Sequence, residues 1–189
     1  MINKQNLLVK LQDNQIQGII GKVLQLPIEV GGYVVENNPY SNYLELYDPE
    51  GKKLVDDVAT YILEFTPELL DKEFNSILVG GLGLGVVPFV VQDFCDTIDI
   101  IEIDTNIINI NQQLDVLNSK VNVIEGDVFT FQPTKTYDII LIDVMYRPMS
   151  EEMTNNLTSK YLPFLNEGGF LYYPINVTSK ENTTVIVNK

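Results

Sequence analysis

Ile77-Leu78-Val79-Gly80-Gly81-Leu82-Gly83-Leu84-Gly85 is the stretch of this 189-residue sequence that decides the fold. Its first three residues form an apolar run of the kind found in a strand buried on both faces of a parallel sheet. The glycines Gly81, Gly83 and Gly85 remove side chains where the backbone must turn or approach another group closely. A helix-like segment then continues to about Phe94. The stretch therefore predicts a strand, a tight turn and a helix, which is the repeating unit of an open α/β sheet.

Four more apolar segments follow this unit, and helix-length spacers separate most of them. The predicted strands are Ile98–Ile103, Val121–Ile124, Tyr137–Ile142 and Phe170–Tyr173. Two spacers carry helix-start signals: Thr105 can cap a helix reaching about Leu117, and Ser150 opens one that runs through Leu165. Strands that alternate with helices predict a doubly wound α/β fold with a Rossmann-like, mostly parallel sheet.

The first part of the chain has a different pattern, with short β-type segments broken by turn residues. The predicted strands are Leu7–Leu11, Gln15–Ile20, Val30–Val35 and Tyr43–Leu46, followed by a helix over Asp56–Phe65 and a second helix start at Thr66-Pro67-Glu68. We expect a β-rich region with a helix over residues 1–72 and a Rossmann-like domain over residues 73–189. Few residues follow the fifth strand, so we expect a shortened C-terminal end with a last strand near Thr184–Val187.

The net charge and the scarcity of histidine and cysteine limit which partners the protein can bind and which side chains could act in catalysis. With 26 acidic and 12 basic side chains the formal net charge is −14, which argues against a nucleic-acid partner because that needs clustered Lys and Arg. An acidic surface would attract a small cationic substrate. The alternative is that the negative charge only keeps the protein soluble. The chain has no histidine and one cysteine, Cys95, which excludes ordinary zinc sites, so no metal is expected. Catalysis would then depend on carboxylates, tyrosines, lysines or positioning.

The N-terminal residues do not resemble a signal peptide, and no apolar segment is long enough to cross a bilayer. A single cysteine permits no internal disulfide, which suits a reducing compartment. We therefore expect a cytoplasmic protein with no membrane partner and with a small-molecule substrate. A homodimer is compatible with the sequence.

The glycine turn does not match the dinucleotide-binding fingerprint G-x-G-x-x-G, because the sixth position counted from Gly81 is Val86. Glycine instead occupies every second position from 81 to 85, and the predicted helix starts directly afterwards. The free N–H groups at a helix start suit a bound carboxylate. The alternative is a turn that only lets strand and helix pack closely.

Three carboxylates lie where predicted strands end. Glu102 lies near the end of the second strand, where doubly wound folds place an acid for ribose hydroxyls, and its alternative is a solvated acid. Asp127 follows the third strand, where it is placed either to accept a hydrogen bond from an adenine amino group or to form a turn after Gly126. Asp143 ends the fourth, where an acid is costly unless it is paired, solvated or functional. Beside the glycine turn, the three acids favour a nucleoside-binding site.

Residues from about Asn75 to Tyr173 resemble a class I S-adenosylmethionine (SAM)-dependent methyltransferase domain, and within that superfamily the spermidine synthase (polyamine aminopropyltransferase) branch. The matching segments are Ile77–Gly85, Ile101–Asp104, Val123–Asp127, Tyr137–Asp143 and Leu165–Gly169. The resemblance implies a class I methyltransferase-type fold with SAM or its decarboxylated form as cofactor. It also implies roles for the three acids: Glu102 would hold the ribose, Asp127 the adenine, and Asp143 would be the catalytic residue that acts on or orients the attacking amine.

The sequence departs from the spermidine synthase pattern at two places. Leu84 stands where that branch has an Asp that holds the amino end of the donor. The second acid of the branch's Asp-Ser-Ser-Asp-Pro motif is missing after Asp143, and Arg147 follows instead. Both departures concern substrate binding more than nucleoside binding, so they favour methyl transfer over aminopropyl transfer.

Three functions are compatible with these observations. The first is a transferase that uses SAM to methylate a small molecule, and the second is aminopropyl transfer from decarboxylated SAM to a diamine. The third is a non-catalytic protein that keeps the fold to bind a nucleoside or a partner. Five tyrosines could line an acceptor pocket or serve as packing: Tyr40, Tyr43, Tyr146, Tyr172 and Tyr173.

Overall fold

The computed structural model describes residues 26–40, 43–56, 74–144, 150–173 and 185–188. The chain divides into two compact units. One unit contains the N-terminal residues together with 82–94 and 104–119, and the other contains 74–81, 95–103 and the chain from 120 onward. The predicted domain boundary after residue 72 falls outside the described residues and stays a prediction.

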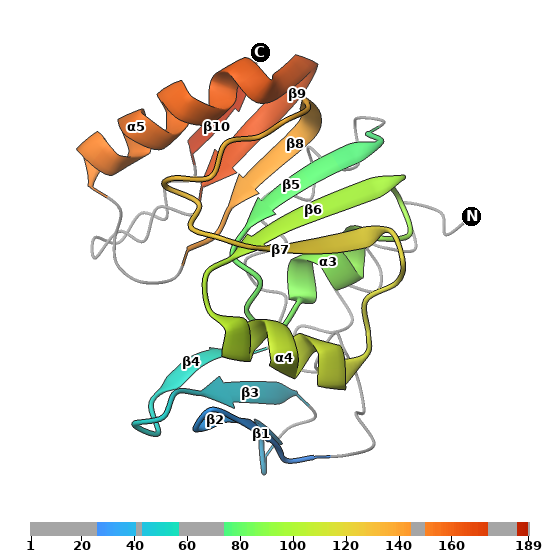
Figure 1. Ribbon diagram of the computed structural model, residues 1–189, viewed down its shortest axis with the longest axis vertical. Helices are drawn as coiled ribbons and strands as arrows, with labels where there is room; N and C mark the ends of the chain where they lie inside the picture. The colour runs from blue at the N-terminus through green and yellow to red at the C-terminus, as the bar shows by residue number, and fades with distance from the viewer. Residues whose placement is uncertain (1–25, 41–42, 57–73, 145–149, 174–184, 189) are drawn as a thin grey trace. The chain divides into compact units, whose positions relative to one another are not determined.

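The second unit contains a six-stranded sheet in the order β10-β9-β8-β5-β6-β7, which can be followed in Figure 1. All neighbouring strands pair in parallel except β10, which is antiparallel to β9. Since the first strand of this sheet lies between the second and the fourth, the chain order reverses next to β5, as in doubly wound folds. The strands are β5 (Ser76–Gly80), β6 (Thr97–Glu102), β7 (Val121–Glu125), β8 (Tyr137–Ile142), β9 (Leu165–Tyr173) and β10 (Val185–Asn188). The predicted doubly wound fold is confirmed.

Apolar runs form the central strands because these strands are covered on both faces. Ile77, Leu78 and Val79 of β5 are each 0% exposed. The strand β8 matches its predicted bounds, β7 is one residue longer at its end, and β5 and β6 differ from theirs by one residue at each end. The strand β9 begins earlier than predicted because Leu165 already pairs with Tyr137 at the start of β8, ahead of a register shift that precedes the pairing of Phe170 with Ile139.

The helices of the described residues are α3 (Val86–Val91), α4 (Thr105–Leu114), α5 (Glu151–Tyr161) and the 3-10 turn η2 (Leu162–Phe164). The predicted cap at Thr105 is wrong, because Asp104 caps α4 by accepting a hydrogen bond from the Asn106 N–H. That helix ends before its predicted Leu117, since Asp115 adopts a left-handed conformation with φ of 50°. Ser150 caps α5 as predicted, although α5 ends at Tyr161.

An apolar core joins α5 to the sheet within the second unit. Tyr161 is 0% exposed, and its hydroxyl donates to the Val128 carbonyl at 2.6 Å. The hydroxyls of Thr158 and Tyr173 share a hydrogen bond of 2.5 Å. Tyr172 and Tyr173 are therefore packing residues at 2% and 0% exposure, so they do not line an open acceptor pocket. Tyr40 is 95% exposed, and Tyr146 lies outside the described residues.

The N-terminal unit contains an antiparallel four-stranded sheet in the order β1-β2-β3-β4, as Figure 1 shows. Its strands are β1 (Ile28–Val30), β2 (Tyr33–Asn37), β3 (Leu44–Tyr47) and β4 (Lys53–Asp56). The predicted single strand Val30–Val35 is wrong, because Gly31 and Gly32 have φ of 57° and 86° and turn the chain into a hairpin. Asp56, predicted to begin a helix, ends β4. The predicted strands before residue 26 and the helical segments of 57–73 lie outside the described residues.

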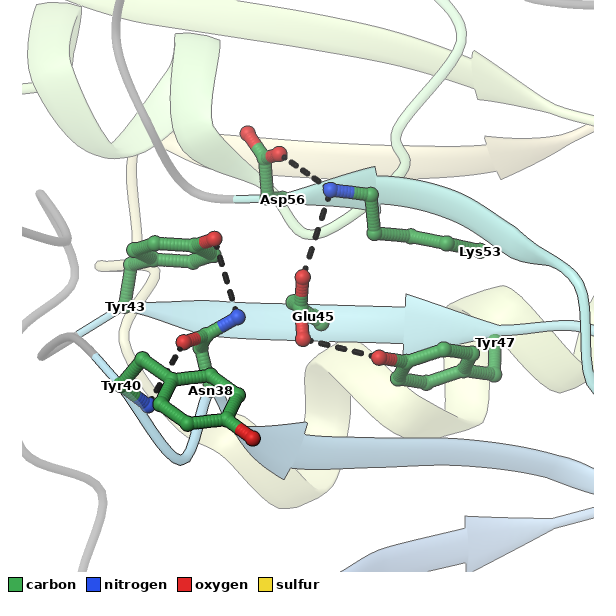
Figure 2. Close-up of polar contacts among 7 residues, drawn as sticks. All are labelled: Asn38, Tyr40, Tyr43, Glu45, Tyr47, Lys53 and Asp56. Atoms are coloured by element: carbon green, nitrogen blue, oxygen red, sulfur yellow. Dashed lines mark hydrogen bonds and ion pairs between the residues drawn. The ribbon is translucent and has the colours of Figure 1, made fainter.

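A buried carboxylate organises one face of this small sheet (Figure 2). The Glu45 side chain is 6% exposed, accepts from the Tyr47 hydroxyl at 2.8 Å and pairs with Lys53 at 3.2 Å. The same Lys53 ammonium pairs with Asp56 at 3.1 Å. Burial alone would raise the pKa of Glu45, but the hydrogen bonds from Tyr47, Asn38 and Lys53 outweigh it and lower that pKa. The carboxylate thus stays charged and ties β3 to β4.

None of the helices in the described part of the chain is both long enough and apolar enough to span a membrane.

Candidate functional site

Backbone hydrogen bonds align the carboxyl ends of the central strands of the second unit. The Asp143 N–H donates to the Gly80 carbonyl at 2.7 Å, and the Gly81 N–H donates to the Ile101 carbonyl at 2.8 Å. The Gly126 N–H donates to the Glu102 carbonyl at 2.9 Å. These bonds extend the strand pairing to the residues that follow β5, β7 and β8. They place Gly81, Glu102, Asp127 and Asp143 along one edge of the sheet, as their positions at strand ends predicted.

Gly81 lies directly beside Asp143 at the point where the chain order reverses. Its φ is 98°, and a Cβ added there would collide with the carbonyl oxygen of Asp143. Only glycine meets both conditions, because it tolerates positive φ and has no Cβ. The glycine therefore permits the close approach of β5 and β8 at the edge that doubly wound folds use for ligands.

The Asp143 carboxylate is partly buried and has no hydrogen-bond or charged partner among the described residues. Burial raises its pKa from 3.8 to about 6. A desolvated carboxylate without a partner is energetically unfavourable and is the usual mark of a group kept for binding or catalysis. Such an acid is ionised at neutral pH and is more basic than an ordinary carboxylate, so it can hold a cation or accept a proton.

Glu102 ends β6 and is buried, at 9% exposure. Its neighbour in the chain, Ile103, is 62% exposed. This strand end thus carries a buried acid followed by an exposed apolar side chain. Sequence reasoning missed Ile103, although an apolar residue directly after a strand-end acid was a visible signal.

Asp127 forms the turn that follows β7. Its Oδ1 accepts from the Phe129 N–H at 2.8 Å, and its carbonyl accepts from the Phe131 N–H at 2.7 Å. One carboxylate oxygen of Asp127 therefore stabilises the turn, as the turn-forming alternative predicted. This turn also holds Phe129, which is 41% exposed and was not singled out from the sequence.

Gly83 and Gly85 belong to the N-terminal unit, where helix α4 contacts them. Their φ values are 52° and 74°. Asn111 of α4 donates from Nδ2 to the Gly83 carbonyl at 2.7 Å, and its Oδ1 lies 2.5 Å from where a Cβ on Gly85 would stand. Leu84 between them is 1% exposed, so its side chain packs inward. Asn111 interrupts the otherwise apolar buried face of α4, which is the sequence signal by which it could have been found.

The comparisons with known proteins give structural likeness and no sequence family. No protein-family model matches the chain, and no curated protein matches it by sequence. The N-methyltransferase NodS from Bradyrhizobium japonicum, in complex with S-adenosyl-L-homocysteine (SAH), superimposes with a TM-score of 0.51 at 18% identity over 60% of this chain and 58% of that one. DhpI in complex with SAM and HEP gives 0.51 at 15% identity over 65% and 58%. The glycopeptide N-methyltransferase MtfA gives 0.51 at 16% identity over 61% and 52%.

These likenesses establish the class of fold. The chain has the Rossmann-like fold of class I SAM-dependent methyltransferases, preceded by an antiparallel four-stranded sheet. It spans less than two thirds of the length of each of these three structures. The finer resemblance to the spermidine synthase branch receives no support from them.

Proposed function

We propose that this protein is a SAM-dependent methyltransferase that acts on the amine of a small molecule. The observation that carries the proposal is the partly buried Asp143 carboxylate, which has no partner among the described residues and lies beside Gly81, where the order of the strands reverses. Two of the structures with this fold are N-methyltransferases, which supports an amine as the acceptor. The formal net charge of −14 favours the approach of a cationic acceptor.

The residues at the sheet edge fit an adenosyl group. Gly81 lets β5 and β8 approach closely at this edge, because a Cβ there would collide with the Asp143 carbonyl. Glu102 would accept hydrogen bonds from the two ribose hydroxyls, and the second carboxylate oxygen of Asp127 would accept from the adenine amino group. SAM supplies an electrophilic methyl group on a sulfonium, and the protein's task is to place the acceptor in line with it.

Asp143 would serve the acceptor rather than the cofactor. As the new N–CH₃ bond forms and the S–CH₃ bond breaks, the sulfur keeps the bonding electron pair and SAH leaves as a neutral thioether. A cationic amine must first give up one proton so that its lone pair can attack the methyl group, and the Asp143 carboxylate would accept that proton and pass it to solvent; the methylated nitrogen then leaves as an ammonium ion. The same carboxylate would orient the amine before the reaction.

Calorimetric titration with SAM, decarboxylated SAM and 5′-methylthioadenosine tests the cofactor. We expect SAM to bind, and we expect Glu102→Ala to weaken its binding about tenfold or more because the ribose loses its acceptor. Tighter binding of decarboxylated SAM would support aminopropyl transfer instead. Binding without methyl transfer to any of a panel of amines would support a non-catalytic role, and the absence of binding to all three compounds would refute the proposal.

The role of Asp143 predicts opposite effects of Asp143→Asn on stability and on activity. At about pH 7.5 the wild-type protein holds a desolvated charge, so Asn should raise the free energy of unfolding by about 1–3 kcal/mol. The gain should vanish below about pH 3, where the carboxyl group is protonated in both the folded and the unfolded state. Wild-type kcat/KM should fall as the pH drops below about 6 and Asp143 takes up a proton, while the variant should be about 100-fold slower or worse. A variant that is fully active would exclude this role.

A further inference from the structure

Two adjacent side chains at the end of helix α5 hold the turn that follows β7, and all of these residues belong to the second unit. The Tyr161 hydroxyl donates to the Val128 carbonyl at 2.6 Å, and the Lys160 ammonium donates to the Phe129 carbonyl at 2.7 Å. The two bonds join positions that are 33 and 31 residues apart in the sequence. Consecutive residues of the helix thus hold consecutive peptides of the turn.

These two peptides are also the ones that bind Asp127. In a trans peptide the C=O and the N–H point in opposite directions, so a bond that holds the carbonyl also sets the direction of the N–H. The peptide that Tyr161 holds carries the Phe129 N–H, which donates to Asp127 Oδ1 at 2.8 Å. The peptide that Lys160 holds carries the Thr130 N–H, which donates to the Asp127 carbonyl at 3.0 Å. The end of α5 therefore controls both the side chain and the main chain of Asp127.

The position of Lys160 also has an ordinary explanation, because a basic side chain in the last turn of a helix suits the negative end of the helix dipole. The dipole does not explain why the ammonium donates to a carbonyl outside α5, in a turn far away in the sequence. Burial lowers the pKa of Lys160, and the side chain forms no ion pair with any described residue. The ammonium therefore gives up part of its hydration to hold the turn.

The turn leaves one oxygen of the Asp127 carboxylate for a ligand. Oδ1 accepts from the turn itself, whereas Oδ2 accepts no hydrogen bond from a described residue. An ionised carboxylate oxygen only accepts hydrogen bonds, so Oδ2 suits an amino group. Because Oδ1 and Oδ2 are fixed to the same carbon, the bond that orients Oδ1 also determines where Oδ2 points.

We propose that Tyr161 and Lys160 are positioning residues that direct the second carboxylate oxygen of Asp127 toward the amino group of adenine. This inference rests on the proposed function, in which Asp127 binds that group. It makes the end of α5 a determinant of base selectivity, although neither side chain contacts the base. Burial raises the pKa of Tyr161, so its hydroxyl keeps its proton and remains a donor.

The test compares two ligands that differ only in the amino group. They are SAH and its 6-deamino analogue, in which purine replaces adenine. We expect the wild-type protein to bind SAH about tenfold more tightly than the analogue, because the analogue has no amino group for Asp127 to accept from. In Tyr161→Phe, which removes only the hydroxyl, the Kd for SAH should rise about fivefold or more and the Kd for the analogue should stay within about twofold.

Tyr173→Phe is the matched control, because it removes an equally buried hydroxyl that bonds to Thr158 of the same helix and not to the turn. Both dissociation constants should stay within about twofold in this variant. Lys160→Met keeps the test decisive if Tyr161→Phe fails to fold, since it removes only the ammonium of a partly exposed side chain. It should show the same selective loss of SAH binding, and Lys160→Arg, which keeps a donor, should restore it.

Equal weakening of both ligands, or an unchanged Kd for SAH, in either folded variant would overturn the positioning role. A wild-type protein that binds the two compounds equally well would overturn it too, because Asp127 would then not bind the amino group. If the wild-type protein binds neither compound, the proposed function itself fails. Normal wild-type selectivity with unaffected variants refutes this inference alone.

Discussion

Glycine at position 81 is subject to two separate constraints, and a pair of substitutions can separate them. Gly81 and Gly168 both have positive φ, 98° and 76°, but a Cβ at Gly81 would meet the Asp143 carbonyl while nothing lies within 4 Å of a Cβ at Gly168. We expect Gly168→Ala to cost about 1–2 kcal/mol from backbone strain alone. Gly81→Ala should cost about 1–3 kcal/mol more because β5 and β8 must separate. Urea unfolding of both variants measures this difference. Equal decreases in the free energy of unfolding would mean that the Asp143 carbonyl can shift to admit a Cβ at little cost.

Single residues also show which parts of the site could be read from the sequence. The positions of Glu102, Asp127 and Asp143 were predictable, because apolar runs reveal where buried strands end and parallel strands end at the same edge. The contact of Asn111 with Gly83 was not predictable, since it joins residues 28 positions apart and depends on how α4 packs. That Asp143 has no partner within the described part of the chain also requires the structure, because a sequence does not show which charges are paired.

At the scale of elements, the central strands were predicted more accurately than the N-terminal ones. Strands buried on both faces are continuous apolar runs, and β8 was predicted with its exact bounds. Three of the four short strands of the small antiparallel sheet, β1, β2 and β4, contain exposed residues, so their pattern is weaker. At Gly31 and Gly32 the turn signal was visible, but the residues on both sides favour strands, and only the positive φ values show that the chain reverses.

The strands β6 and β8 are linked across β5 by two buried side chains, and their bond should be sensitive to pH. The Tyr137 hydroxyl donates to Asp99 at 2.8 Å, and Lys135 pairs with the same carboxylate at 2.8 Å. Burial alone would raise the pKa of Asp99, but bonds from Lys135, Asn122 and Tyr137 outweigh it and lower that pKa. The stabilisation is therefore present above the ordinary pKa of Asp, about 3.9, and is lost as the pH falls through the lower pKa of the folded state.

We expect Tyr137→Phe to cost about 1–3 kcal/mol at about pH 7 and less at about pH 2, as the pH falls toward the lowered pKa of Asp99 in the folded state. The control is Tyr161→Phe, because its equally buried hydroxyl donates to the uncharged Val128 carbonyl and its loss should not depend on pH. Urea unfolding of both variants at the two pH values gives the comparison. If the cost of Tyr137→Phe does not change with pH, the Tyr137 hydroxyl does not stabilise the charged form of Asp99 over its protonated form.

For the whole molecule, the excess of acidic over basic side chains predicts a response to salt. With 26 acidic and 12 basic residues the formal net charge is −14, and repulsion among like charges opposes the compact state. Lys53 and Lys135 are already engaged with Glu45, Asp56 and Asp99, so the remaining acids have few cations to offset them. Because salt shortens the range of this repulsion to about 10 Å at 0.1 M, Tm should rise by several degrees between about 10 mM and about 200 mM NaCl.

Choline chloride at the same ionic strength is the control, since a general screening effect does not depend on which cation supplies it. Equal rises of Tm in the two salts would show that the negative charge acts as a long-range field, which is also the property that would draw a cationic acceptor toward the protein. A Tm that stays constant would mean that the acids repel one another only weakly at the distances at which they lie. The net charge would then no longer support a cationic acceptor, and among this protein's own features only Asp143 would still favour an amine.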